Sequence, residues 1–137
     1  MSESGTLAKL NNLGQSVWYD NIDRKLIQNG EISGLISAGV RGLTSNPSIF
    51  EKAISSSEVY DSDIEIMSRQ GKSASEIFES LAVSDIRNAA EILSSVYSET
   101  NGADGFVSLE VNPHLANDTN GTVGEARRLF KLSLIHI

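Results

Sequence analysis

Short apolar runs alternate with longer amphipathic stretches along this 137-residue chain. The runs SVWYDNI (residues 16–22), VRGLTSN (40–46) and GFVSLEV (105–111) are rich in aromatic and β-branched residues. Such runs are typical of buried strands when polar or glycine residues follow them. The pattern therefore predicts three short strands that are widely separated in the sequence.

Helical spacing dominates the segments after the first two strands. Residues 23–40 carry apolar side chains three and four positions apart, with Gly30 and Gly39 as expected stops. Pro47 can open a helix over residues 47–54, because the first helical position needs no N–H donor. Residues 55–57 are expected to end it.

Two stretches have the form of a capping box, in which a hydroxyl residue and a glutamate three positions later cap a helix start. Residues 73–76 (SASE) precede an apolar stripe that continues to residue 97, which predicts a helix of about six turns. Residues 122–125 (TVGE) predict the start of a further helix, EARRLFKL.

The predicted order is strand, helix, strand, helix, strand, helix, and the helices are long enough for crossovers. This order indicates an α/β fold with a parallel sheet covered by helices. Doubly wound sheets and (β/α) barrels both fit the pattern. The strands are followed by neither a G-x-G-x-x-G motif nor a P-loop, which argues against a nucleotide-binding version.

Composition narrows the function classes. Hydrophobic residues make up 39% and charged residues 21% of the chain, as in globular domains. The net charge of −7 argues against nucleic-acid binding. Cysteine is absent, which excludes disulfides and thiolate catalysis. We expect a cytoplasmic protein without membrane contact, because neither a signal peptide nor a run of about 20 apolar residues occurs.

Each predicted strand ends near a residue capable of chemistry: Asp20, Asn46 and Glu110. Parallel strands place their carboxyl ends on one face, so we expect the three side chains to converge. Simpler roles exist for each residue alone. Asp20 could cap a helix or lie in a solvated loop, and Asn46 could form an Asx-turn. Glu110 has apolar neighbours and therefore needs a partner or a shifted pKa.

The remaining polar candidates are weaker. His114 lies in a predicted loop without a second ligand at metal-binding spacing, which indicates a surface histidine and no metal site. Lys52 and Lys131 fall on predicted helices and are expected to be solvated.

Four blocks resemble successive blocks of bacterial transaldolases: LGQSVWYDNI, GVRGLTSNPSIFEKAI, DGFVSLEVNPHLANDT and GEARRLF. The similarity covers residues 7–130 and is closest to the branch that also occurs fused to phosphoglucose isomerase. It implies a (β/α)8 TIM barrel, of which residues 1–131 would supply about the first three β/α units. It also implies class I aldolase chemistry, with a lysine Schiff base and no metal or cofactor.

The resemblance implies substrates and roles as well. Transaldolases move a dihydroxyacetone unit between sugar phosphates of the pentose phosphate pathway: sedoheptulose 7-phosphate, fructose 6-phosphate, glyceraldehyde 3-phosphate and erythrose 4-phosphate. By position, Asp20 matches the aspartate that takes the proton of the C4 hydroxyl, and Glu110 matches the acid/base that works through a water. Asn46 matches the amide that binds the substrate, and Thr44 in the same block is assigned to substrate binding.

The match departs from the family at the carboxyl end. The family carries its Schiff-base lysine on a fourth strand, beyond EARRLF, whereas this chain reads KLSLIHI. Lys131 belongs to the preceding helix and cannot inherit the role. We expect residues 132–137 to be a non-native tail, from a translated adapter or a frameshift, and the 137-residue chain to be inactive. A related small aldolase and a non-catalytic α/β module that binds a sugar phosphate or a partner remain alternatives.

Overall fold

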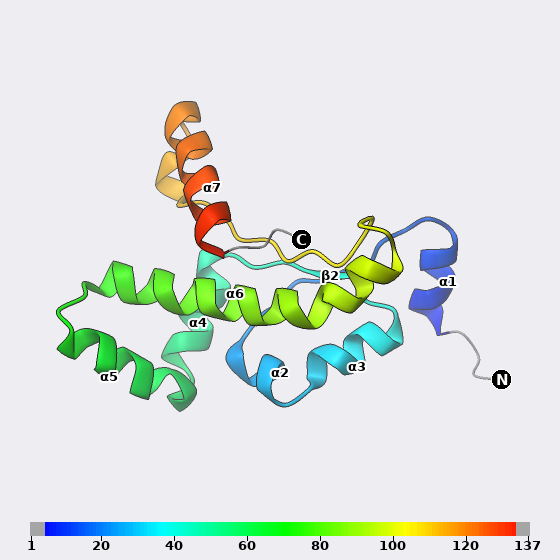
Figure 1. The fold of residues 1–137 in the computed structure, drawn as a ribbon, viewed down its shortest axis with the longest axis horizontal. Helices are drawn as coiled ribbons and strands as arrows, with labels where there is room; N and C mark the ends of the chain where they lie inside the picture. Colours follow the sequence, from blue (N-terminus) through cyan, green and yellow to red (C-terminus); the bar gives the residue numbers. More distant parts are fainter. Residues whose placement is uncertain (1–4, 134–137) are drawn as a thin grey trace.

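The computed structural model describes residues 5–133 (Figure 1). Its helices are α1 (Thr6–Asn12), α2 (Arg24–Gln28), α3 (Glu31–Ala38), α4 (Pro47–Ser55), α5 (Asp61–Arg69), α6 (Ala74–Glu99) and α7 (Thr119–Ser133), with short 3-10 helices η1 (Glu58–Tyr60) and η2 (Pro113–Leu115). The strands are β1 (Trp18–Tyr19) and β2 (Gly42–Leu43). The chain is thus a mostly helical α/β structure.

The sheet is parallel, as the element order predicted. Trp18 pairs with Gly42 and Tyr19 with Leu43. The third predicted strand, residues 105–111, joins β2 through an isolated parallel bridge between Leu43 and Val107. The regular pairing is therefore shorter than the seven-residue runs predicted for each strand. It stops at Ser45 and Ser108, where side-chain hydroxyls replace backbone groups as hydrogen-bond partners.

Several helix boundaries follow their sequence signals. Asn46 caps α4, with Pro47 at its first position, and α4 ends at Ser55. The capping box of α6 is confirmed, since the Ser73 hydroxyl accepts the Glu76 N–H and the Glu76 side chain accepts the Ser73 N–H. Gly30, at φ 83°, separates α2 from α3 within the predicted helix of residues 23–40.

The second predicted capping box is wrong. Helix α7 begins at Thr119, so Thr122 lies inside its first turns. Asp118 provides the cap instead, because its Oδ1 accepts the Gly121 N–H at 2.9 Å. The Thr122 hydroxyl donates to the Leu115 carbonyl at 2.9 Å and ties α7 to η2. Helices α1 and α5 had no counterpart in the sequence prediction.

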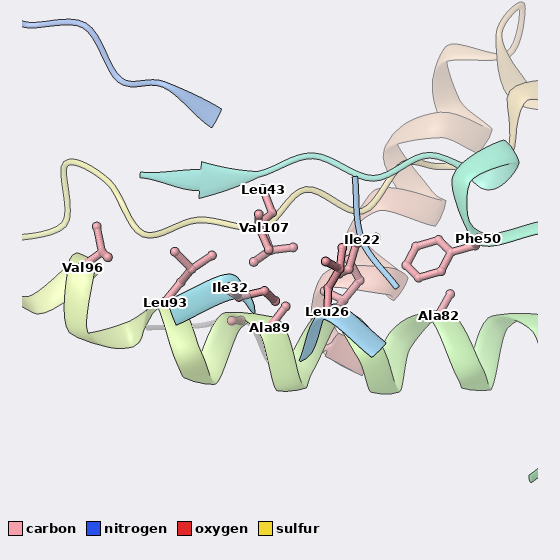
Figure 2. Packing of buried hydrophobic residues seen from close by; sticks show 12 residues of the cluster. Ile22, Leu26, Ile32, Leu43, Phe50, Ala82, Ala89, Leu93, Val96 and Val107 are labelled. Atoms are coloured by element: carbon pink, nitrogen blue, oxygen red, sulfur yellow. The ribbon is translucent and has the colours of Figure 1, made fainter. Parts of the chain in front are cut away.

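The core lies between the strands and α6 (Figure 2). Leu43 and Val107 point from the strands toward Ala89 and Leu93 of α6, while α2 and α3 close the same side (Figures 1 and 2). The buried cluster consists of Ile22, Leu26, Ile32, Leu43, Phe50, Ala82, Ile86, Ala89, Ala90, Leu93, Val96 and Val107. Because side chains alternate along a strand, the neighbours of Tyr19, Leu43 and Val107 face away from this core.

The predicted boundary between residues 131 and 132 falls inside α7, which continues to Ser133. Residues 134–137 of the predicted tail lie outside the described residues. Over residues 5–133, none of the helices is long and apolar enough to cross a membrane.

Candidate functional site

Asp20 and Thr44 meet at the carboxyl ends of β1 and β2. The Thr44 N–H donates to the Tyr19 carbonyl at 3.0 Å, which continues the ladder by one bond. Its hydroxyl donates to Asp20 Oδ1 at 2.5 Å. The register places residues 20, 44 and 108 side by side in one row, on the side opposite the core. Asp20 is exposed and Thr44 half-buried, so this carboxylate is open to a ligand while one oxygen is held.

Asn46 plays the local role that the sequence left open for it. Its Oδ1 accepts the Ile49 N–H at 2.9 Å and caps α4. Such a cap satisfies one of the orphan donors of a helix start. The side-chain NH2 group, with two donors, is the part of the amide that this cap leaves unused. A half-buried donor group thus lies two residues beyond Thr44.

Ser45 and Ser108 join the second and third strand ends, and neither was singled out by the sequence. Ser45 is 1% exposed. Its hydroxyl donates to the Ser108 carbonyl at 2.6 Å, and its N–H donates to Ser108 Oγ at 3.1 Å. Only its position between Thr44 and Asn46 could have drawn attention to Ser45.

Glu110 opens onto a hollow of about 270 Å³ between α6, η2 and α7. The lining is an apolar floor with an acidic rim: Pro47, Ser75, Phe78, Glu79, Ala82, Val83, Leu109, Glu110, Asn112, Pro113, His114, Glu125 and Leu129. Asp20, Thr44 and Asn46 do not line this hollow. The structure therefore joins Asp20 to Thr44 directly, and the convergence of Asp20, Asn46 and Glu110 stays a prediction.

The rim of this hollow is held by one arginine. Arg128 donates to Glu79 and to Glu125, with 2.8 Å from Nη1 to Glu79 Oε1 and 2.8 Å from Nε to Glu125 Oε2. The hydrogen bond from Arg128 lowers the pKa of Glu125, and the pKa of Arg128 is raised by the same two partners. His114 is exposed, as predicted. Within residues 5–133, no acidic or histidine cluster has the arrangement of a metal site.

A second polar cluster lies on the helical side, away from the strand ends. Arg24 Nε donates to Asp85 Oδ1 at 2.9 Å, and the Tyr60 hydroxyl donates to Asp85 Oδ2 at 2.8 Å. Asp85 and Tyr60 are fully buried. Burial raises the pKa of Asp85, against the opposing hydrogen bonds from Tyr60 and Arg24. Burial also raises the pKa of the Tyr60 hydroxyl.

This cluster had a signal in the sequence, which the prediction of site residues at strand ends did not use. Asp85 lies inside the apolar stripe of α6, between the buried Ala82 and Ile86. A carboxylate at such a position needs partners, which Arg24 and Tyr60 supply. The Tyr60 oxygen also accepts the Arg24 N–H at 2.9 Å, so the cluster secures the start of α2.

The lysines of the chain all lie on the surface. Lys9, Lys25, Lys52, Lys72 and Lys131 are exposed, and each belongs to a helix or to the turn before α6. A Schiff-base lysine has to be desolvated or placed beside another cation to attack a carbonyl. The lysines of residues 5–133 lie at neither strand end.

The comparisons with known proteins point to one family. Residues 17–134 match the family model "Transaldolase/Fructose-6-phosphate aldolase". A "Transaldolase" of Trichodesmium erythraeum is 50% identical over 125 residues, which are 90% of this chain and 33% of the relative. "Transaldolase 2" of Nostoc punctiforme is 48% identical over 91% of this chain and 33% of the relative. A "Transaldolase" of Neisseria gonorrhoeae is 44% identical over 90% and 35%. The chain spans about a third of the length of these relatives.

Proposed function

The chain belongs to the Transaldolase/Fructose-6-phosphate aldolase family, and we propose that it forms the first three β/α units of a cytoplasmic transaldolase barrel. The complete enzyme would transfer a dihydroxyacetone unit from sedoheptulose 7-phosphate or fructose 6-phosphate to glyceraldehyde 3-phosphate or erythrose 4-phosphate. The hydrogen bond between Thr44 and Asp20 carries the proposal, because it orients an exposed carboxylate at adjacent parallel strand ends.

Each site residue has a role in the proposed reaction. Asp20 takes the proton of the substrate's C4 hydroxyl while the C3–C4 bond breaks. One of its oxygens is fixed by Thr44, so the other faces the reacting hydroxyl with a defined geometry. Asn46 donates from its free NH2 group to the substrate, since its oxygen caps α4. Glu110 exchanges protons with a water during the formation of the Schiff base.

Thr44 receives a more specific role than substrate contact. Its hydroxyl proton is committed to Asp20, so a substrate hydroxyl could reach Thr44 only as a donor to its oxygen. We assign Thr44 first to the orientation of Asp20.

The 137-residue polypeptide by itself is proposed to be inactive. The surface positions of Lys9, Lys25, Lys52, Lys72 and Lys131 support this, because none offers the desolvation that a Schiff-base lysine needs. The relatives are about three times as long as this chain, and the lysine is assigned to the part that it does not match.

A chimera tests the proposal. Residues 1–130 are joined to the carboxyl-terminal two-thirds of the Trichodesmium erythraeum transaldolase, beside the 137-residue chain as control. The chimera is expected to transfer the three-carbon unit from fructose 6-phosphate to erythrose 4-phosphate. It should also gain a covalent adduct when borohydride reduces the Schiff base. The 137-residue chain should do neither.

Site variants of the chimera sharpen the test. Asp20→Asn should lower kcat by about 10²–10⁴-fold, which is the range for loss of a general base. Asp61→Asn, an exposed carboxylate at the start of α5, should leave kcat unchanged. A folded chimera that transfers nothing would overturn the proposal. If such a chimera still binds fructose 6-phosphate, the non-catalytic binding module is favoured.

A further inference from the structure

Two hydrogen bonds flank the bridge between Leu43 and Val107 as in a parallel ladder. The Leu43 N–H donates to the Phe106 carbonyl at 3.1 Å, and the Ser108 N–H donates to the Leu43 carbonyl at 3.0 Å. A parallel ladder is evenly spaced, so the next bond would run from the Ser45 N–H to the Ser108 carbonyl.

That next bond is replaced by two bonds through side chains. The Ser45 N–H donates to Ser108 Oγ at 3.1 Å, and Ser45 Oγ donates to the Ser108 carbonyl at 2.6 Å. Each hydroxyl thus stands between a backbone donor and the acceptor it would otherwise meet. We name this pair of bonds, formed by Ser45 and Ser108, the serine clamp. It joins the two strand ends through side-chain hydroxyls where a ladder would have a direct backbone bond.

The serine clamp is close in sequence to two residues of the proposed reaction. Asn46 follows Ser45, and Glu110 lies two residues beyond Ser108. Ser45 is 1% exposed, so water cannot replace a lost partner without rearrangement. An unsatisfied buried donor or acceptor is unfavourable, and the clamp therefore fixes one geometry at this point.

From this geometry we infer that Ser45 and Ser108 are positioning residues, which set the separation of Asn46 and Glu110 for the three-carbon transfer. The inference rests on the proposed function. Without the Ser45 hydroxyl, the Ser45 N–H can pair directly with the Ser108 carbonyl and close the strand ends into a regular ladder. Asn46 would move toward the third strand end, although its own side chain is unchanged.

The test uses the chimera and a matched control at the end of α6, just before the third strand. Thr100 has a similar double hydroxyl bond at the opposite, amino-terminal side of residues 105–111. Its Oγ1 donates to the Val96 carbonyl at 2.8 Å and accepts the Asp104 N–H at 3.0 Å. Ser45→Ala, Ser108→Ala and Thr100→Ala each remove such a hydroxyl, and Ser45→Thr keeps it.

The expected result is a split between kinetics and stability. Ser45→Ala and Ser108→Ala should lower kcat by about tenfold or more, with KM within about twofold, since a shift of about 1 Å can lower a rate by about 10²-fold. Thr100→Ala should lower the Tm by about as much as Ser45→Ala does, but it should leave kcat unchanged. Ser45→Thr should retain kcat within about threefold of the parent, because the hydroxyl is still present.

Two results would overturn the inference, and they are distinguishable. Equal kcat values for Ser45→Ala and Thr100→Ala in an active chimera would show that the serine clamp is only structural. This leaves the proposed function standing. A folded parent chimera without transfer would overturn the proposed function, and the positioning role with it.

Discussion

The two sides of the short sheet are held by different chemistry. On the helical side, buried apolar residues of the strands meet α6 (Figure 2). On the same side, Asp85 forms buried hydrogen bonds with Arg24 and Tyr60. At the strand ends, the joining bonds are made by short hydroxyl side chains, from Thr44 to Asp20 and between Ser45 and Ser108.

This difference separates stability from chemistry. Full burial of a large apolar side chain contributes about 1.5–3 kcal/mol, and the helical side contains most such residues. Exposed hydrogen bonds contribute little net free energy, but they fix the direction of groups such as the Asp20 carboxylate. Substitutions on the helical side should therefore change mainly the free energy of unfolding.

The largest expected effect is on the buried ionic cluster. Asp85→Ala leaves Arg24 buried without its buried partner and should lower the free energy of unfolding by about 3–5 kcal/mol. Glu65→Ala removes an exposed partner of Arg69 and should cost at most about 0.5 kcal/mol. Urea unfolding, followed by far-ultraviolet circular dichroism, measures both. Equal effects would show that the cluster does not carry the stability of the helical side.

A smaller effect is expected at Gly42 on the open side of the sheet. A Cβ atom there would lie 2.5 Å from the Trp18 ring, so the indole must move. Gly42→Ala should destabilise by about 1–3 kcal/mol, as overpacking does.

Gly34 provides the matched control, because a Cβ there meets no atom within 4 Å. Gly34→Ala in α3 should stabilise by about 0.5–1 kcal/mol. Thermal unfolding measures both variants, and the fluorescence of the single tryptophan reports whether its ring has moved. If Gly42→Ala has no effect on stability, the side of the sheet that faces away from α6 has room for an additional side chain beside Trp18.

Next in size is the capping box of α6. Ser73→Ala removes the hydroxyl that accepts the Glu76 N–H and should destabilise by about 1 kcal/mol. Ser84→Ala, at an exposed position within α6, should change stability by only a few tenths of a kcal/mol. Urea midpoints of the two variants decide. A larger effect at Ser84 would contradict a cap-dependent start of this helix.

The smallest effect concerns pH. Hydrogen bonds from the Ser73 hydroxyl and N–H lower the pKa of Glu76 below its ordinary value of 4.5. A lowered pKa in the folded state gives stability that is present above the unfolded value and is lost as the pH falls through the folded value. Tm should therefore fall less steeply below pH 4.5 in Glu76→Gln than in the parent.

The difference between the two Tm profiles isolates Glu76. Burial raises the pKa of Asp85, which makes stability depend on pH in the opposite sense, but this contribution is the same in the parent and in Glu76→Gln. Identical slopes would contradict the assignment.

Several local features and the family could be predicted from the residues alone. The Ser73–Glu76 capping box, Pro47 after Asn46 and the apolar stripe of α6 are signals within one helix, so neighbouring residues suffice to specify them. The parallel order of β1 and β2 followed from the helices between them. The resemblance of successive blocks to transaldolases was confirmed by the family match over residues 17–134.

The pairing of distant side chains by hydrogen bonds depends on how the whole chain packs. Ser45 and Ser108 are 63 residues apart, and Arg24 and Asp85 are 61 apart, so no local pattern connects them. The same holds for the end of the ladder, where hydroxyls replace a backbone bond. The cap of α7 is a local choice between Asp118 and Thr122, and Asp118 makes it. Helix signals act over a few residues. The hydrogen-bond partner of a side chain at a strand end depends instead on which strands lie side by side, and the packing against α6 decides this.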